Sequence, residues 1–186
     1  MMTKYTSLIA LLITFMMACT PENITSEERQ GDYFDLVGFT ETQVKLLDEQ
    51  QVQVSKNIHY GDSSDTITTH SIDWEEEFKL FREVNLNKPV LKDAFTVDSL
   101  DHKGQESITY TAKESDMKIK KVVIVKEDSI PVSIEVFLER SNFLFSNTTH
   151  LQMHLQKGVC QHYLIEGQKQ VILMGEDTYK VEGRVL

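Results

Sequence analysis

The chain has 186 residues, of which 26% are charged and 40% are hydrophobic, and its formal net charge at pH 7 is −10. An acidic surface repels phosphate backbones, so this composition argues against nucleic acid as a partner. The length suits a single domain with its own hydrophobic core.

The chain begins with the pattern of a secretory signal. Lys4 is the only charged residue among the first 21, and an apolar stretch follows it over residues 8–17. A resident membrane helix needs about 20 apolar residues to cross roughly 30 Å of hydrocarbon. Because this stretch is shorter and ends at the small residue Ala18, it predicts a removable signal peptide, residues 1–18.

The signal ends in Met16-Met17-Ala18-Cys19, which resembles the lipobox of bacterial lipoproteins. The resemblance implies cleavage before Cys19, a diacylglycerol on its thiol and an acyl chain such as palmitate on its amine. Each buried CH₂ contributes about 0.8 kcal/mol, and several chains hold far better than one. We therefore expect Cys19 to anchor the protein in the cell envelope, at the outer membrane. The alternative is an ordinary signal cleaved after Ala18, which leaves Cys19 unmodified.

A polar segment follows the proposed anchor. Residues 20–30 are polar and charge-rich, so they bury too little apolar area to offset the entropy of ordering. We expect residues 19–30 to form a lipidated flexible tether and residues 31–186 to form one domain. Cleavage removes Lys4, so the net charge of the mature chain becomes −11. With Cys19 lipidated, Cys160 is the sole thiol, and no intramolecular disulfide can form.

Two helices are predicted in the first half of the domain. Apolar residues at three- and four-residue steps predict a helix over 32–50. Residues 51–72 contain two β-rich runs separated by Gly-Asp-Ser-Ser-Asp at 61–65, which predicts a hairpin. Asp73 with Glu76 three residues later is a capping-box pattern that begins the second helix, and Pro89 is expected to break it.

The second helix carries a heavy aromatic face. Trp74, Phe78 and Phe81 lie at i, i+4 and i+7. Such a face can form a ligand cage, but aromatic side chains supply much of the buried area of ordinary cores, so core packing is the favoured reading.

The remainder, from residue 94 onward, predicts strands. Apolar and polar residues alternate with period two, and turn residues recur at short intervals. No helical crossover intervenes, so the sheet should be antiparallel throughout. We expect an α+β domain with two helices packed on a curled antiparallel meander of about eight to ten strands.

One cluster of metal-ligand residue types occurs in HLQMHLQKGVCQHYLIE, residues 150–166. A two-residue turn at 157–158 would pair Gln156 with Val159 and turn His154 away from Cys160 and His162. A three-residue loop would pair Leu155 with Val159 and separate apolar from polar residues more cleanly, so we favour it. His154, Cys160 and His162 would then be cross-strand neighbours that could bind zinc. A solvent-facing polar surface explains the same residues without a metal.

Three short triplets indicate covalent modification. Asp65-Thr66-Ile67, Asp98-Ser99-Leu100 and Asp128-Ser129-Ile130 are similar to sites where Bacteroidota O-glycosylate exported proteins. The resemblance implies glycans on Thr66, Ser99 and Ser129, which must then be exposed. Together with the lipobox, these triplets make the chain resemble the small uncharacterised lipoproteins of that phylum.

The residue patterns leave several functions open. The chain lacks the GxSxG, HExxH, P-loop and CxxC motifs, so we predict neither an enzyme nor a cofactor. A structural or interaction lipoprotein with protein partners in the envelope is favoured. The alternative is a carrier or sensor of an apolar ligand, by analogy with the half-barrels of the LolA and LolB lipoprotein carriers. Its cavity would be lined by Trp74, Phe78, Phe81, Val136 and Leu138.

Overall fold

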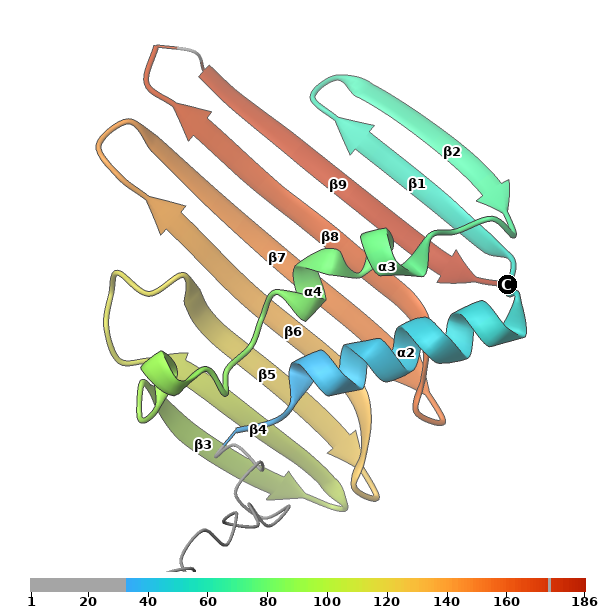
Figure 1. Ribbon diagram of the computed structural model, residues 1–186, viewed down its shortest axis with the longest axis horizontal. Coiled ribbons are helices and arrows are strands. Elements are labelled where there is room, and N and C mark those ends of the chain that lie inside the picture. The colour runs from blue at the N-terminus through green and yellow to red at the C-terminus, as the bar shows by residue number, and fades with distance from the viewer. Residues whose placement is uncertain (1–32, 174) are drawn as a thin grey trace, which may run out of the picture. The chain divides into compact units, whose positions relative to one another are not determined.

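A computed structural model describes residues 33–173 and 175–186. They form an α+β domain in which helices lie on one face of a nine-stranded antiparallel sheet (Figure 1). This confirms the fold class that the sequence predicts. The predicted signal peptide and tether, with Cys19, lie outside the described residues. None of the described helices combines the length and the apolar character that a membrane crossing requires.

The first predicted helix is present as α2 (Leu36–Gln50), which begins four residues later than the pattern indicates. Asp35 is its N-cap, because the carboxylate accepts a hydrogen bond from the Gly38 N–H at 3.0 Å. Tyr33, which precedes the cap, packs edge-on against the rings of Phe95 and Tyr110. The cap residue therefore fixes where the helix begins, and the aromatic residue before it holds the incoming chain against the sheet.

The second predicted helix is divided into α3 (Trp74–Glu77) and α4 (Lys79–Arg82). Asp73 caps α3 as predicted, and its carboxylate accepts a hydrogen bond from the Glu76 N–H at 3.1 Å. The prediction that this helix continues to Pro89 is wrong, since α4 ends at Arg82 and Pro89 begins a short 3-10 helix, η2 (Pro89–Leu91). Tertiary packing overrides the local pattern, because Val84 and Leu86 reach the core from an irregular segment.

All strand pairs are antiparallel, and the strand order is β2-β1-β9-β8-β7-β6-β5-β4-β3. The strands are β1 (Val54–Tyr60), β2 (Ser63–Thr69), β3 (Phe95–His102), β4 (Gln105–Ala112), β5 (Ile119–Glu127), β6 (Ile130–Ser141), β7 (Phe145–Gln156), β8 (Val159–Val171) and β9 (Gly175–Val185). The predicted meander is thus β3–β9. The first hairpin, whose turn is only Gly61-Asp62, adds to the meander beside β9.

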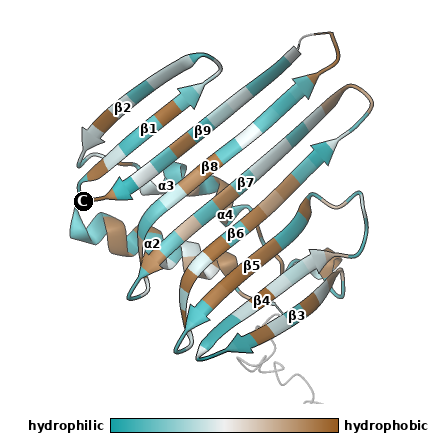
Figure 2. Cartoon of the chain, turned by 180° about the vertical axis from the view of Figure 1, so that it is seen from behind, coloured by the Kyte–Doolittle hydropathy of each residue, from teal (hydrophilic) through white to brown (hydrophobic). Residues whose placement is uncertain are grey.

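The helices reach their face because the chain must cross the sheet. The β1–β2 hairpin lies at one edge and β3 at the other, and α3, α4 and η2 connect them across the same face as α2 (Figure 1). The opposite face, seen in Figure 2, carries none of the described helices. One face of the sheet therefore packs against the helices to form the core, and the other face is exposed to solvent.

The core centres on a close approach between β8 and β9. Tyr163 of β8 lies over Gly183 of β9, where any Cβ would overlap the tyrosine ring. Phe78 packs edge-on against Tyr163 with ring centroids 5.2 Å apart. Residues Asp32–Leu186 form one compact unit, and the described core lies within it.

Candidate functional site

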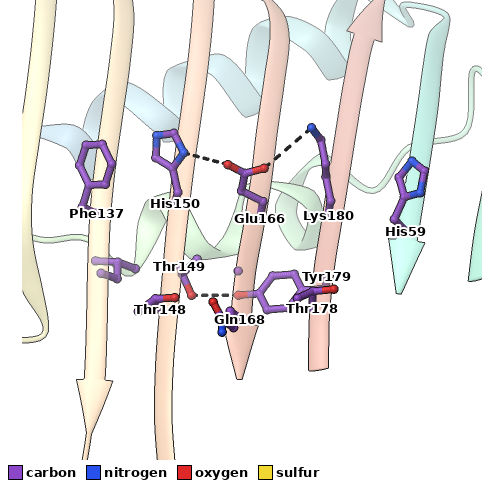
Figure 3. A pocket seen from close by; sticks show the side chains of 12 residues that line it. His59, Phe137, Thr148, Thr149, His150, Glu166, Gln168, Thr178, Tyr179 and Lys180 are labelled. Atoms are coloured by element: carbon purple, nitrogen blue, oxygen red, sulfur yellow. Dashed lines mark hydrogen bonds and ion pairs between the residues drawn. The ribbon is translucent and has the colours of Figure 1, made fainter. Parts of the chain in front are cut away.

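The face without helices carries an ordered row of side chains that crosses five neighbouring strands (Figure 3). Alternation along each strand directs every second residue to this face. The registers bring one residue from each of β6, β7, β8, β9 and β1 side by side: Phe137, His150, Glu166, Lys180 and His59. We call these five residues the outer row.

Side chains of the outer row contact one another directly. The rings of Phe137 and His150 are stacked, with centroids 4.5 Å apart and planes inclined by 10°. Nδ1 of His150 lies 3.2 Å from Oε1 of Glu166, whose Oε2 lies 3.8 Å from Nζ of Lys180. Nε2 of His150 is buried without a hydrogen-bond partner among the described residues, since Oε2 of Glu135 is 3.9 Å away. Stacking on Phe137 and the hydrogen bond with Glu166 together hold the imidazole ring in place.

A second polar network lies beside the outer row. Nε2 of His162 is 2.8 Å from Oε1 of Glu182, and Nη2 of Arg184 donates to the same oxygen at 3.1 Å. The hydrogen bond from His162, assisted by that from Arg184, holds the pKa of the Glu182 carboxyl below its usual value. The carboxylate is therefore ionised over the physiological range and presents fixed negative charge on this face.

An open groove of about 550 Å³ follows the outer row. Three polar residues on the same face extend the groove toward the β6–β7 and β8–β9 turns: Thr148, Gln168 and Thr178. Donors, acceptors, paired charges and one aromatic ring are thus available to a polar partner. Among residues 33–173 and 175–186, no three His, Cys, Asp or Glu side chains are placed to hold a metal ion.

The predicted three-residue loop between β7 and β8 is wrong. Gln156 pairs with Val159 across a two-residue turn, and the extra residue is a bulge at Gln161. Both turn residues, Lys157 and Gly158, have positive φ angles of 52° and 79°, which match the twist of a tight hairpin. Placing the bulge inside the strand allows the turn to be short while the apolar residues stay on the core face.

This register separates the three residues of the predicted zinc cluster. His154 and His162 pair across the strands on the outer face, with ring centroids 5.7 Å apart. Cys160 is fully buried on the core face, and its Sγ donates to the backbone oxygen of His162 at 3.6 Å. Burial raises the pKa of the Cys160 thiol to about 12, so it is a neutral core side chain.

Gln43 of α2 holds this hairpin from the helix side. The side chain is buried, its Nε2 donates to the Gly158 oxygen at 2.9 Å, and its Oε1 accepts from the Cys160 N–H at 2.9 Å. The signal for this role is a glutamine beside the apolar stripe of a predicted helix, but the helical pattern alone does not indicate its partner. The contact spans more than a hundred residues of sequence.

The predicted apolar lining is packed core. Trp74, Phe78, Phe81 and Val136 are buried in the core cluster. Leu138 is also buried, but it borders an open groove of about 520 Å³ between the helical segments and β5. The apolar residues of this second groove were not predicted: Val37, Val84, Val90, Leu91, Met117 and Ile119.

All three predicted glycosylation residues are exposed. Thr66 lies on β2 and Ser99 on β3, the two edge strands of the sheet, and Ser129 lies in the β5–β6 turn. The Thr66 hydroxyl donates to Oδ1 of Asn57 at 2.8 Å, a bond that a glycan would replace.

The chain matches no protein-family model, no curated protein and no solved structure. The residues and contacts described above therefore carry the functional proposal.

We predict that Gln43→Ala destabilises the domain by about 2–4 kcal/mol, because two backbone groups at the β7–β8 turn lose their buried partners. Urea denaturation measures this cost. Because Cys160 is buried, we expect it to react slowly with a thiol reagent at pH 8 in the native protein, and faster in the variant because the hairpin opens more often. Gln156→Ala is the matched control, since Gln156 is exposed on the same hairpin and should change stability by less than about 0.5 kcal/mol. Equal costs for the two variants would contradict the role of Gln43.

Proposed function

We propose that the protein is a lipid-anchored protein of the cell envelope, held at the outer membrane through Cys19, that binds a partner protein through the uncovered face of its sheet. The observation that supports the interaction role most directly is the outer row. It is continuous over five strands, ordered by its own contacts, and open to a partner along a groove.

The chemistry of this face favours binding over catalysis. Its carboxylates lie beside basic groups, as Glu166 does beside Lys180 and Glu182 beside Arg184. Cys160, the one thiol of the proposed mature chain, is buried on the other face. Paired charges of mixed sign suit electrostatic complementarity with a protein surface, and the proposal includes no enzymatic step.

The exposed positions of the predicted glycosylation residues support the same role. Glycans on Thr66 and Ser99 would shield the open edges of β2 and β3 from pairing with another sheet. The uncovered face would remain accessible between the two glycosylated edges.

The anchor is tested by Cys19→Ser in the native host. We expect the wild-type chain to remain with the membrane fraction through high-salt washing, whereas the variant is found in the soluble or medium fraction. Mass spectrometry of the N-terminal peptide should show acyl chains on Cys19. A wild-type chain that begins at an unmodified Cys19 would support the ordinary secretory signal instead.

The interaction face is tested by photo-cross-linking in cells. A photoreactive residue at Gln168, which lines the groove, should give a cross-linked band of one defined mass. The matched control is Glu49, an exposed residue of α2 on the opposite layer, which should give no such band. In a Glu166→Lys background the Gln168 band should fall by at least about fivefold, because the outer row loses its central carboxylate. Equal cross-linking from Gln168 and Glu49, or none from Gln168, would contradict the proposed face.

A second candidate function is supported by the groove between the helical segments and β5. Its apolar residues and its volume of about 520 Å³ suit a hydrocarbon chain, and Lys88 of its lining could pair with an acidic headgroup, whereas Arg82 and Lys118 are paired with Glu75 and Glu83. This feature keeps the carrier hypothesis open, although the groove lies away from the aromatic cluster that the sequence indicated.

Native mass spectrometry separates the two candidates. The unlipidated chain, residues 19–186 with Cys19→Ser, would be purified from the periplasm without detergent. An interaction protein should show the bare polypeptide mass. A carrier should show an excess that organic solvent removes and that Met117→Lys abolishes, because a charge would enter the apolar groove. Leu100→Lys, at an exposed apolar residue outside this groove, is the matched control.

A further inference from the structure

Two neighbouring hairpin tips expose apolar side chains at one end of the sheet. Phe143 and Leu144 form the tip between β6 and β7, and Ile172 and Leu173 belong to the tip between β8 and β9. Their exposed fractions are 82%, 52%, 56% and 100%. The Ile172 N–H donates to the Leu144 oxygen at 2.9 Å, so the two tips form one surface. We call these four residues the tip patch, and Figure 2 shows apolar residues at both tips.

Hydrogen bonds of the Asn142 side chain and backbone, rather than apolar contacts, shape the first tip. Oδ1 of Asn142 accepts from the Leu144 and Phe145 N–H groups at 2.8 and 3.0 Å, and the Asn142 N–H donates to the Phe145 oxygen. This turn leaves the Phe143 side chain pointing away from the domain. Folding therefore does not require an aromatic residue at this position.

The second tip places leucine where turn chemistry disfavours it. Leu173 has a φ of 70°, in the left-handed region that glycine and asparagine adopt more readily, and its side chain is fully exposed. Neither core packing nor turn geometry explains the residue. An exposed apolar side chain in a disfavoured backbone conformation indicates a function for that side chain.

The chemistry and the shape of the tip patch fit a lipid bilayer. The tips themselves, residues 141–145 and 170–175, contain no Asp, Glu, Lys or Arg, and charged residues begin on either side of them at Arg140, Lys169, Glu176 and Asp177. Side chains that project from two turns enter a fluid interface readily, whereas a protein partner would need a matching pocket for each. The neutral tips also avoid the repulsion that an acidic domain meets at anionic headgroups.

The chain enters the domain at the end of the sheet that carries the tip patch. Tyr33 packs on Phe95 at the start of β3, and the Phe95 N–H donates to the Tyr33 hydroxyl at 3.4 Å. Because strand directions alternate, the start of β3 lies at the same end of the sheet as the tip patch. Cys19 precedes Tyr33 by 14 residues, which span at most about 50 Å when extended. This step rests on the proposed anchor at Cys19, whereas the others do not.

We infer that the tip patch is a membrane-contact site that inserts Phe143 and Leu173 into the interfacial region of a neutral or zwitterionic bilayer. The contact would orient the domain with its strands rising from the membrane. It uses apolar burial alone, so it should be insensitive to salt.

The test uses residues 19–186 with Cys19→Ser, so that no lipid anchor contributes and the result does not depend on lipidation. We expect this protein to float with phosphatidylcholine vesicles, equally at low and high salt. Phe143→Ser with Leu173→Ser should weaken partitioning by at least about tenfold, because two side chains lose their apolar environment. The matched control pair, Leu100→Ser with Ile130→Ser, replaces exposed apolar residues at the opposite end and should leave partitioning unchanged.

Phe143→Trp provides an independent readout. Its emission should shift to the blue with vesicles and be quenched by brominated lipid, whereas the buried Trp74 of the parent protein should not respond. The inference is overturned if the parent protein does not float, or if both serine pairs weaken partitioning equally. It is also overturned if the protein does not bind vesicles and forms dimers that only the tip-patch pair disrupts, because the occupant would then be a second copy. If the cell experiment showed that Cys19 carries no lipid, these outcomes would be unchanged, because the vesicle test uses a protein without an anchor.

Discussion

The contact of Phe78 with Tyr163 over Gly183 fixes how the helical layer sits on the sheet. Tyr163 can lie across β9 only because Gly183 has no side chain, and its ring then packs in T-shaped contacts with Phe78 and Trp74. The same contact buries the tyrosine hydroxyl, which raises its pKa, with the nearby Glu77 carboxylate adding to the effect. Glu77 is in turn paired with Lys56 of β1 at 2.6 Å. A partly buried ion pair adds little net stability, but an unpaired charge in its place would be costly, so the pair helps to specify where α3 docks.

The helical layer covers only part of the long central strands. On β7 the buried positions begin at Thr149 and on β8 they end at Ile165, so several residues of each strand extend beyond the helices. These extensions carry one end of the outer groove and lead to the tip patch. The helices therefore leave two surfaces free. One is the outer face of the sheet, which is the proposed interaction face, and the other is the extended end of the strands, which carries the proposed membrane-contact site.

Local patterns in the sequence predicted the elements well, and the contacts between distant elements poorly. Period-two alternation identified the strands from residue 95 onward, and Asp73 identified the start of α3, because both signals are local. The β7–β8 register was missed because a bulge at the turn and a bulge at Gln161 preserve nearly the same apolar pattern. Gln43, which contacts this hairpin from α2, is too distant in sequence for a local pattern to include. The pairing of β1 with β9 was missed for the same reason.

The outer row is ordered in a way that stability alone does not require. Solvent-exposed ion pairs such as Glu166–Lys180 contribute at most about 1 kcal/mol each, and the strands beneath them are already fixed by their backbone ladders. The residues of this face are therefore free to be selected for what they bind. Its histidines illustrate the point, since His150 contacts Phe137, Glu135 and Glu166, whereas His162 stacks on His154 and contacts Glu182. A domain that rests on its tip patch would hold its strands upright and turn this polar face sideways, toward a neighbour on the same membrane.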